Sequence, residues 1–246
     1  MGRLFALGIL GTATRKEIGA VVLGCWGAAV LGCCGAVVLS GQVLSAQTGS
    51  VTGTITTTAR GLAPVRVTID QKVCGGELPD HAIVVDGQGH LANAVVVLTG
   101  VKGTAVAETT VTNDKCAFAP RVQIVRSKAN VKTTSKDPIL HTTNAQLENG
   151  RTLFNVALPI AGLTVTKSIG NAGTVRLSCN THPWMRGWVV VTDDLAMVTG
   201  ADGQFSLESV PPGTYELRIW HESLKSAPQK ITVAAGKPTN LTGQRK

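Results

Sequence analysis

GTVRLSCNTHPWMRGWVVVTD, residues 173–193, shows a short strand pattern at each end and a group of sulfur and imidazole side chains between them. In its first half, Val175, Leu177 and Cys179 alternate with polar residues. The two-residue period of a β-strand turns these three side chains toward the same face of a sheet. A proline and a glycine then limit the loop before GWVVVTD starts the next strand. The stretch therefore predicts two strands joined by a loop that carries Cys179, His182 and Met185.

This loop combines a thiol, an imidazole and a thioether. Sulfur ligands of this kind suit copper, and two histidines, one cysteine and a weak axial methionine make a blue-copper site, whereas a thioether is a poor zinc ligand. A second histidine must come from elsewhere, and the best candidate is His141 in the segment KDPILHTTN. The structural alternative makes Cys179 an inert buried thiol, Met185 a core side chain and His182 a surface residue.

The rest of the chain is β in texture, and no stretch has a convincing helical period. Short β-branched runs are bounded by Gly, Pro, Asn or Asp, which is typical of sandwiches and barrels. The texture changes to a compact, hairpin-rich unit around TDDLAMVTGADG, so we expect one domain over 47–193 and a second over 194–246. The further strand candidates are VTGTITTT (51–58), VRVTI (65–69), AVVVLTG (94–100), FAPRVQIV (118–125), YELRIW (215–220) and QKITVAA (229–235).

The N-terminus predicts export. Basic residues precede an uncharged run over 18–39, and small residues follow up to Ala46. This pattern favours a secretory signal over 1–46 with cleavage after Ala46. The apolar run also has the roughly 20 residues that span a bilayer, so an uncleaved anchor is an alternative. VLGC, ending at Cys25 and again at Cys33, leaves lipid anchoring as a third. All three place the remainder across a membrane, periplasmic or on the outer face.

Three cysteines remain after such a leader: Cys74, Cys116 and Cys179. In an oxidising compartment an odd number suggests one disulfide and one thiol with another occupation, so we expect Cys74 to pair with Cys116. The leader contains three of the 23 basic and one of the 15 acidic residues, so the net charge falls from +8 to +6. Without a basic run or aromatic stripe, nucleic acid is a poor partner and an acidic protein surface a better one.

The ligand loop also resembles a known family. CNTHPWMRGWVVV and DPILHTTN are similar to the two ligand segments of cupredoxins of the plastocyanin and amicyanin type. Over roughly residues 50–193 the resemblance implies a Greek-key β-sandwich with one type 1 copper held by His141, Cys179, His182 and axial Met185. Many cupredoxins have Asn after the first histidine, and this residue braces the ligand loop. Thr142 occupies that position here, which puts the hydrogen bonding around the site in question.

The second unit has its own resemblance. VTGADGQFSLESVPPGTYELRIWHE (198–222) is similar to the carboxypeptidase regulatory-like module, a small transthyretin-like β-sandwich. Such modules pack or adhere and lack peptidase residues, so the resemblance implies no zinc peptidase. The pair His221-Glu222 has no companion ligand and is interpreted as structural. His81 and His90 lie in polar, Gly-rich surroundings and are expected to be exposed.

The four-ligand set favours a non-enzymatic protein that passes single electrons between redox partners, and the N-terminus predicts that it is exported. The alternative is a copper-sequestering or structural interaction protein with a cupredoxin shell. A storage protein is expected to have more than three methionines, and an oxidase more than five histidines. We expect electrons to leave at a surface patch of His182, Pro183 and Trp184, toward an acidic redox protein; the alternative is that Trp184 packs against the second domain and covers His182. We expect the protein to contact a membrane only if the N-terminal segment remains uncleaved.

Overall fold

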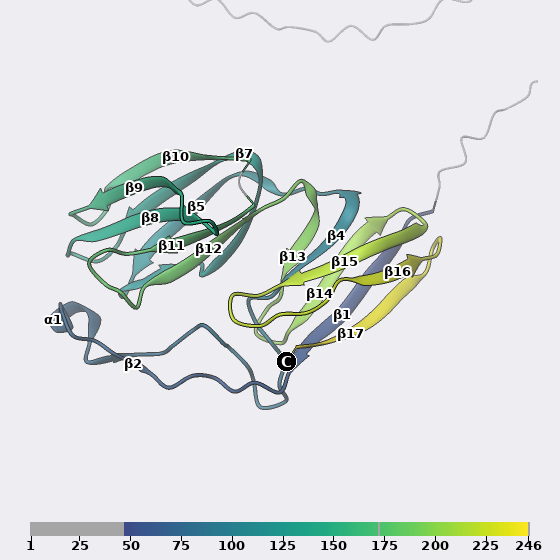
Figure 1. The fold of residues 1–246 in the computed structure, drawn as a ribbon, viewed down its shortest axis with the longest axis horizontal. Coiled ribbons are helices and arrows are strands. Elements are labelled where there is room, and N and C mark those ends of the chain that lie inside the picture. Colours follow the sequence, from purple (N-terminus) through teal and green to yellow (C-terminus); the bar gives the residue numbers. More distant parts are fainter. Residues whose placement is uncertain (1–46, 172, 246) are drawn as a thin grey trace, which may run out of the picture. The chain divides into compact units, whose positions relative to one another are not determined.

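The computed structural model describes residues 47–171 and 173–245, and nearly all of their regular structure is β (Figure 1). The one helix among these residues is the four-residue α1 (Gln71–Cys74). No helix in the described part is long and apolar enough to cross a membrane. The expectation of an all-β chain is confirmed. The cleaved signal, uncleaved anchor and lipid anchor were all assigned to residues 1–46, which lie outside the described residues.

The first sandwich consists of eight strands that follow one another along the chain. In most of them, side chains alternate between buried and more exposed positions, and most of the buried apolar ones belong to one cluster that includes Val131, Val156, Leu177 and Val189. The strands are β5 (Val106–Asp114), β6 (Ala117–Ala119), β7 (Val122–Ser135), β8 (His141–Leu147), β9 (Thr152–Leu158), β10 (Thr164–Gly170), β11 (Thr174–Ser178) and β12 (Arg186–Val191).

Strand β7 changes partners along its 14 residues. Its first residues, from Val122, pair in parallel with β12, whereas Ala129 and the residues after it pair with β10 on one side and β5 on the other. Lys128, with φ 61°, marks the change of direction between the two parts. The strand therefore continues from the layer β12-β11-β8-β9 into the layer of β10, β5 and β6. Strand β7 therefore connects the two layers that enclose the core of the first sandwich.

The second sandwich consists of two sheets, in the orders β14-β1-β17 and β13-β4-β15-β16. Val51 and Ile55 from one sheet and Leu98 and Leu217 from the other belong to the same buried cluster. The strands are β1 (Gly49–Thr57), β4 (Val95–Lys102), β13 (Asp194–Val198), β14 (Gln204–Val210), β15 (Gly213–Trp220), β16 (Gln229–Val233) and β17 (Pro238–Arg245).

Strand pairing revises the contents of the two expected domains, 47–193 and 194–246. A change of element does occur at Asp193, between β12 and β13. However, β1 pairs with β14 and β17, and β4 lies between β13 and β15, so both complete the second sandwich. The first sandwich, within 106–191, is therefore an insertion between β4 and β13. The physical reason is that the strands after Asp193 need β1 and β4 to fill their sheets and bury their apolar faces.

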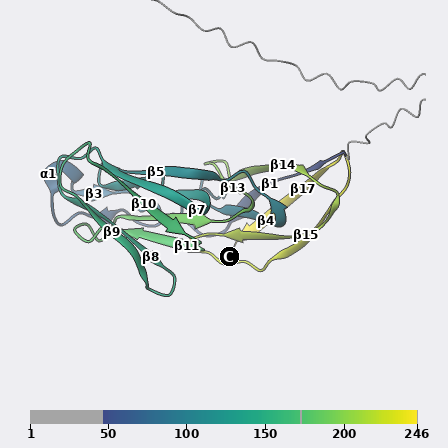
Figure 2. The ribbon, with the colours of Figure 1, turned by 90° about the horizontal axis from the view of Figure 1, so that it is seen from above.

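A loop region between β1 and β4 lies against the first sandwich. It contains the short strands β2 (Val65–Arg66) and β3 (Glu77–Leu78), which pair with each other, and α1 between them. Residues 65–69 were expected to form a longer strand, but only the first two are paired. We call residues 65–78 the strap. Figures 1 and 2 show α1 at the end of the first sandwich, where a disulfide joins Cys74 to Cys116.

Candidate metal centre

Cys179 directly follows β11, and its side chain lies on the buried face of that strand. Val175 and Leu177 are 0% and 1% exposed, and Cys179 is 4% exposed. This is the inward alternation that the sequence predicted. Strand β11 pairs with β12 on one side and β8 on the other, so the cysteine lies next to the start of β8.

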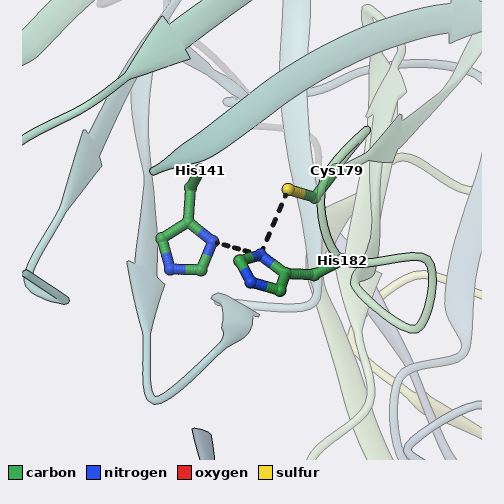
Figure 3. Close-up of side chains that lie close together, drawn as sticks. All are labelled: His141, Cys179 and His182. Carbon is green, nitrogen blue, oxygen red and sulfur yellow. Dashed lines mark hydrogen bonds between the residues drawn. The ribbon is translucent and has the colours of Figure 1, made fainter. Parts of the chain in front are cut away.

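Two histidine rings converge on this cysteine, and both are completely buried. His141 is the first residue of β8, whereas His182 lies in the loop after β11. The Nδ1 atom of His182 is 3.6 Å from the sulfur of Cys179 and 3.1 Å from the Nδ1 atom of His141 (Figure 3). One ligand atom from each of the three residues lies within 4.8 Å of the others. The structure thus brings together three of the four expected ligands.

Met185, the fourth expected ligand, lies at the end of the same loop. Its backbone N–H donates a hydrogen bond to the carbonyl oxygen of His182, at 3.0 Å. Its side chain is 1% exposed and belongs to the same apolar cluster as Cys179. The loop is therefore wound into a turn, and the thioether is buried in the same core as the cysteine.

The surroundings of Cys179 favour a thiolate. Burial alone raises the pKa of this thiol, but hydrogen bonds from His141, from the backbone N–H of Thr142 and from His182 outweigh it and lower the pKa from 9.0 to about 5. The Thr142 N–H is 3.3 Å from the sulfur and the Thr142 hydroxyl is 3.7 Å from it. A deprotonated thiol is the form that binds a metal.

Thr142 also holds the ligand loop. Its hydroxyl accepts a 2.7 Å hydrogen bond from the backbone N–H of Asn180, the residue after Cys179. The side-chain amide of Asn144 donates to the side-chain oxygen of Asn180 at 3.3 Å. Thr142 stands where many cupredoxins have Asn, and the structure shows that a hydroxyl joins the two ligand segments at this position.

Both histidines have a carboxylate on the ring nitrogen that faces away from the cysteine. His141 Nε2 is 3.0 Å from Asp137, which also accepts hydrogen bonds from the backbone N–H groups of Lys115 and Cys116. His182 Nε2 is 3.0 Å from Asp70 of the strap. Sequence reasoning missed both carboxylates. Asp137 had a signal, because it precedes His141 by four residues, whereas Asp70 lies far along the chain from every ligand.

The expected exposure of His182 is wrong. The electron-transfer patch of His182, Pro183 and Trp184 required the His182 ring edge to reach the surface, but this side chain is 0% exposed. Asp70 lies on one side of the ring, and the Trp184 ring has its centroid 5.1 Å from that of His182. Pro183 is exposed and Trp184 is partly exposed. Trp184 packs against the first sandwich and donates to the Cys116 carbonyl oxygen at 3.2 Å.

The other cysteines and histidines are distributed as follows. Cys74 and Cys116 form a disulfide with a Cα–Cα distance of 5.4 Å, which is the expected pairing and leaves Cys179 as the free cysteine of the described chain. Cys116 also lies close to Asp137 and His141, but its sulfur is not available to a metal because it is in the disulfide. His81 is exposed, and His90 is half-buried beside Asp86 at 2.7 Å.

The residues fit a soft, redox-active metal. Two imidazole nitrogens and a thiolate sulfur lie together at buried positions, and the buried thioether of Met185 belongs to the same loop as Cys179 and His182. This donor set suits copper and is unlike the carboxylate and carbonyl oxygens that Mg²⁺ and Ca²⁺ prefer. The carboxylates on the outer nitrogens are typical partners of metal-binding histidines.

Comparisons with known proteins give one family model and several solved structures. Residues 172–244 match the family model of the carboxypeptidase regulatory-like domain, from β11 into β17. The chain is similar to the purple cupredoxin of Nitrosopumilus maritimus, with 22% identity and a TM-score of 0.31 over 34% of this chain and 99% of that one. It is also similar to the amicyanin of Paracoccus versutus, with 17% identity and a TM-score of 0.31 over 39% of this chain and 97% of that one. The comparison with curated proteins gives no match.

Proposed function

We propose that this protein is an exported single-electron carrier with one type 1 copper, held by His141, Cys179 and His182 with Met185 as the axial ligand. The observation that carries the proposal is the convergence of two Nδ1 atoms and a thiol of lowered pKa in a buried site. Copper, when bound, supplies a one-electron couple. The protein residues hold the thiolate, orient the rings and exclude water.

Closure of the site favours electron transfer over catalysis on a substrate. His141 and His182 are 0% exposed, Cys179 is 4% exposed and Met185 is 1% exposed. A catalytic metal site needs an open position for water or substrate, whereas an electron can cross a layer of protein. We therefore propose a carrier without enzymatic activity. The second candidate, a copper-sequestering or structural protein, shares the ligand set but does not require a reversible couple.

The proposed partner is an acidic redox protein outside the cytosol. The Cys74–Cys116 disulfide supports an oxidising compartment, because such bonds are rare where thiols are kept reduced. A net charge of +6 for residues 47–246 would steer an acidic partner toward the protein and would be screened by salt. The second sandwich is proposed to be a packing or adhesion module, as carboxypeptidase regulatory-like modules are.

An electrochemical titration of the copper-loaded protein tests the proposal. A carrier should take up and release one electron per chain reversibly, and its exchange with an acidic redox protein should slow as salt is added. Exchange with a basic redox protein is the control for charge. An irreversible reduction that releases the metal would favour the sequestering alternative.

A further inference from the structure

The strap, residues 65–78, covers the metal centre at His182. The imidazole of His182 is completely buried, and its Nε2 atom faces the carboxylate of Asp70 at 3.0 Å. His182 lies in the loop after β11, whereas Asp70 lies between β2 and α1, far away in the sequence. Folding therefore brings a separate segment of chain onto the outer edge of this ring.

The backbone conformation of Asp70 starts helix α1 without using its carboxylate. Asp70 is in the left-handed region, with φ 53° and ψ 31°, a conformation in which aspartate is enriched among non-glycine residues. Its carbonyl oxygen accepts the N–H groups of Val73 and Cys74, both at 2.9 Å, and so starts α1. Its side chain makes no capping hydrogen bond to this helix. The carboxylate is therefore free for His182.

Several contacts fix the strap in this position. Val67 is fully buried, its N–H donates to Gly76 at 3.0 Å, and the side chain of Gln71 donates to the Val67 carbonyl at 2.7 Å. The Cys74–Cys116 disulfide ties the strap to the first sandwich, and both cysteines are buried. The disulfide is also connected to the other histidine. The N–H of Cys116 donates a hydrogen bond to Asp137, and Asp137 contacts His141.

The two histidine–carboxylate pairs differ in exposure. The side chain of Asp137 is 8% exposed, whereas that of Asp70 is 40% exposed. Asp70 is thus a surface-exposed group in direct polar contact with the His182 ring. A histidine that binds a metal through Nδ1 carries its proton on Nε2, and an acceptor there fixes the orientation of the ring.

We propose that Asp70 is a positioning residue for the metal centre, acting through Nε2 of His182, and that the strap closes this histidine against solvent and against direct contact with a redox partner. The burial of His182 by the strap is independent of any metal, whereas the effect of Asp70 on copper rests on the proposed function. A partner must then exchange electrons across the strap or through neighbouring side chains, instead of at the imidazole edge.

Closure is tested on the metal-free protein by the reactivity of His182 toward diethyl pyrocarbonate, mapped by mass spectrometry. Exposed His81 serves as the internal reference in every sample. We expect His182 to react slowly in the wild type and faster, relative to His81, in Asp70→Ala, because removing the carboxylate opens the Nε2 atom of His182 to the reagent. Glu77→Ala removes the same charge from an exposed position of the strap and should behave like the wild type.

A second arm uses the copper-loaded protein and a chelator. Asp70→Ala should weaken copper retention by roughly 10–100-fold, whereas Asp70→Asn, which keeps an oxygen acceptor, should lie closer to the wild type. A Cys74→Ser/Cys116→Ser variant frees the strap without touching Asp70 and should also expose His182. If neither Asp70→Ala nor the cysteine variant makes His182 more reactive than Glu77→Ala does, the proposal is overturned. If His182 becomes reactive in these variants but neither they nor the wild type bind copper, the result supports the covering of His182 by the strap. The same result would contradict the proposed function.

Discussion

At the scale of single residues, Thr142 holds the two ligand segments together. Its hydroxyl accepts the Asn180 N–H at 2.7 Å and lies 3.7 Å from the sulfur of Cys179. Thr142→Val keeps the shape and the backbone N–H but removes the hydroxyl. We expect the free energy of unfolding to fall by about 0.5–1.5 kcal/mol, because the Asn180 N–H exchanges its acceptor for water. We also expect the reduction potential of the copper-loaded protein to shift. Chemical denaturation and voltammetry measure the two effects.

The neighbouring residue provides the control. Thr143 is buried, and its hydroxyl has no hydrogen-bond partner among the described residues. Thr143→Val removes an unsatisfied polar group from the core and should leave stability unchanged or raise it. Equal losses in the two variants would mean that packing at β8, and not the Thr142 hydroxyl, maintains the loop.

Cys179 should make the stability of the metal-free protein depend on pH. The folded pKa of its thiol is lowered to about 5 from an ordinary 9.0, so between these values the unfolded chain binds more protons than the folded chain. The contribution of Cys179 is therefore fully present above the unfolded pKa and is lost as pH falls toward the folded one. Urea unfolding should show the wild type gaining stability relative to Cys179→Ser as pH rises through this window. Parallel pH profiles of the two proteins would refute the lowered pKa.

At the scale of elements, the disulfide determines whether the strap stays on the sandwich. Cys74 and Cys116 are separated by 42 positions in the sequence, and both side chains are buried. We expect Cys74→Ser/Cys116→Ser to lower the free energy of unfolding by about 3–4 kcal/mol, because the unfolded chain regains the entropy of an open loop. Denaturant titration of the metal-free protein measures this loss. An unchanged midpoint would mean that the strap is stable without its covalent link.

Sequence patterns predicted the ligand segments better than they predicted the surrounding strands. The alternation of Val175, Leu177 and Cys179 placed the thiol correctly because β11 has one apolar and one polar face. Strand β8 gave no such signal, because its buried positions include His141 and Thr143. The pairing of β1 with β14 and β17 joins segments far apart in the chain, and local periodicity contains no information about such partners. The same limitation hid the contact of Asp70 with His182.

At the scale of the whole molecule, the second sandwich is joined to the end of the ligand loop by one arginine. Arg121 makes two hydrogen bonds to the carboxylate of Glu222, at 2.6 and 2.9 Å, and one to the carbonyl of Arg186 at 3.3 Å. The two paired side chains are only 15% and 5% exposed. Arg186 follows Met185 directly. A disturbance of Glu222 in the second sandwich can therefore reach the loop that holds the thioether.

Breaking this ion pair should be costly. Arg121→Ala and Glu222→Ala are each expected to lower the free energy of unfolding by about 1–3 kcal/mol, because each leaves a partly buried charge without its partner. The double variant should lose less than the sum of the two. Arg218→Ala is the matched control, since its pair with Glu216 is exposed and is expected to contribute about 0–1 kcal/mol. Losses at Arg121 and Glu222 that are as small as this, or strictly additive, would exclude the coupling.

The visible absorption spectrum of the protein with one equivalent of Cu(II) tests the central claim most directly. A thiolate at Cys179 bound beside His141 and His182 should give an intense sulfur-to-copper band. The band should disappear in Cys179→Ser and persist in His90→Ala, since His90 pairs with Asp86 away from the site. Met185→Gln should keep the colour and shift the reduction potential. A protein that binds Cu(II) without this band, or keeps it after Cys179→Ser, would contradict the assignment of Cys179, His141 and His182 as a type 1 copper site.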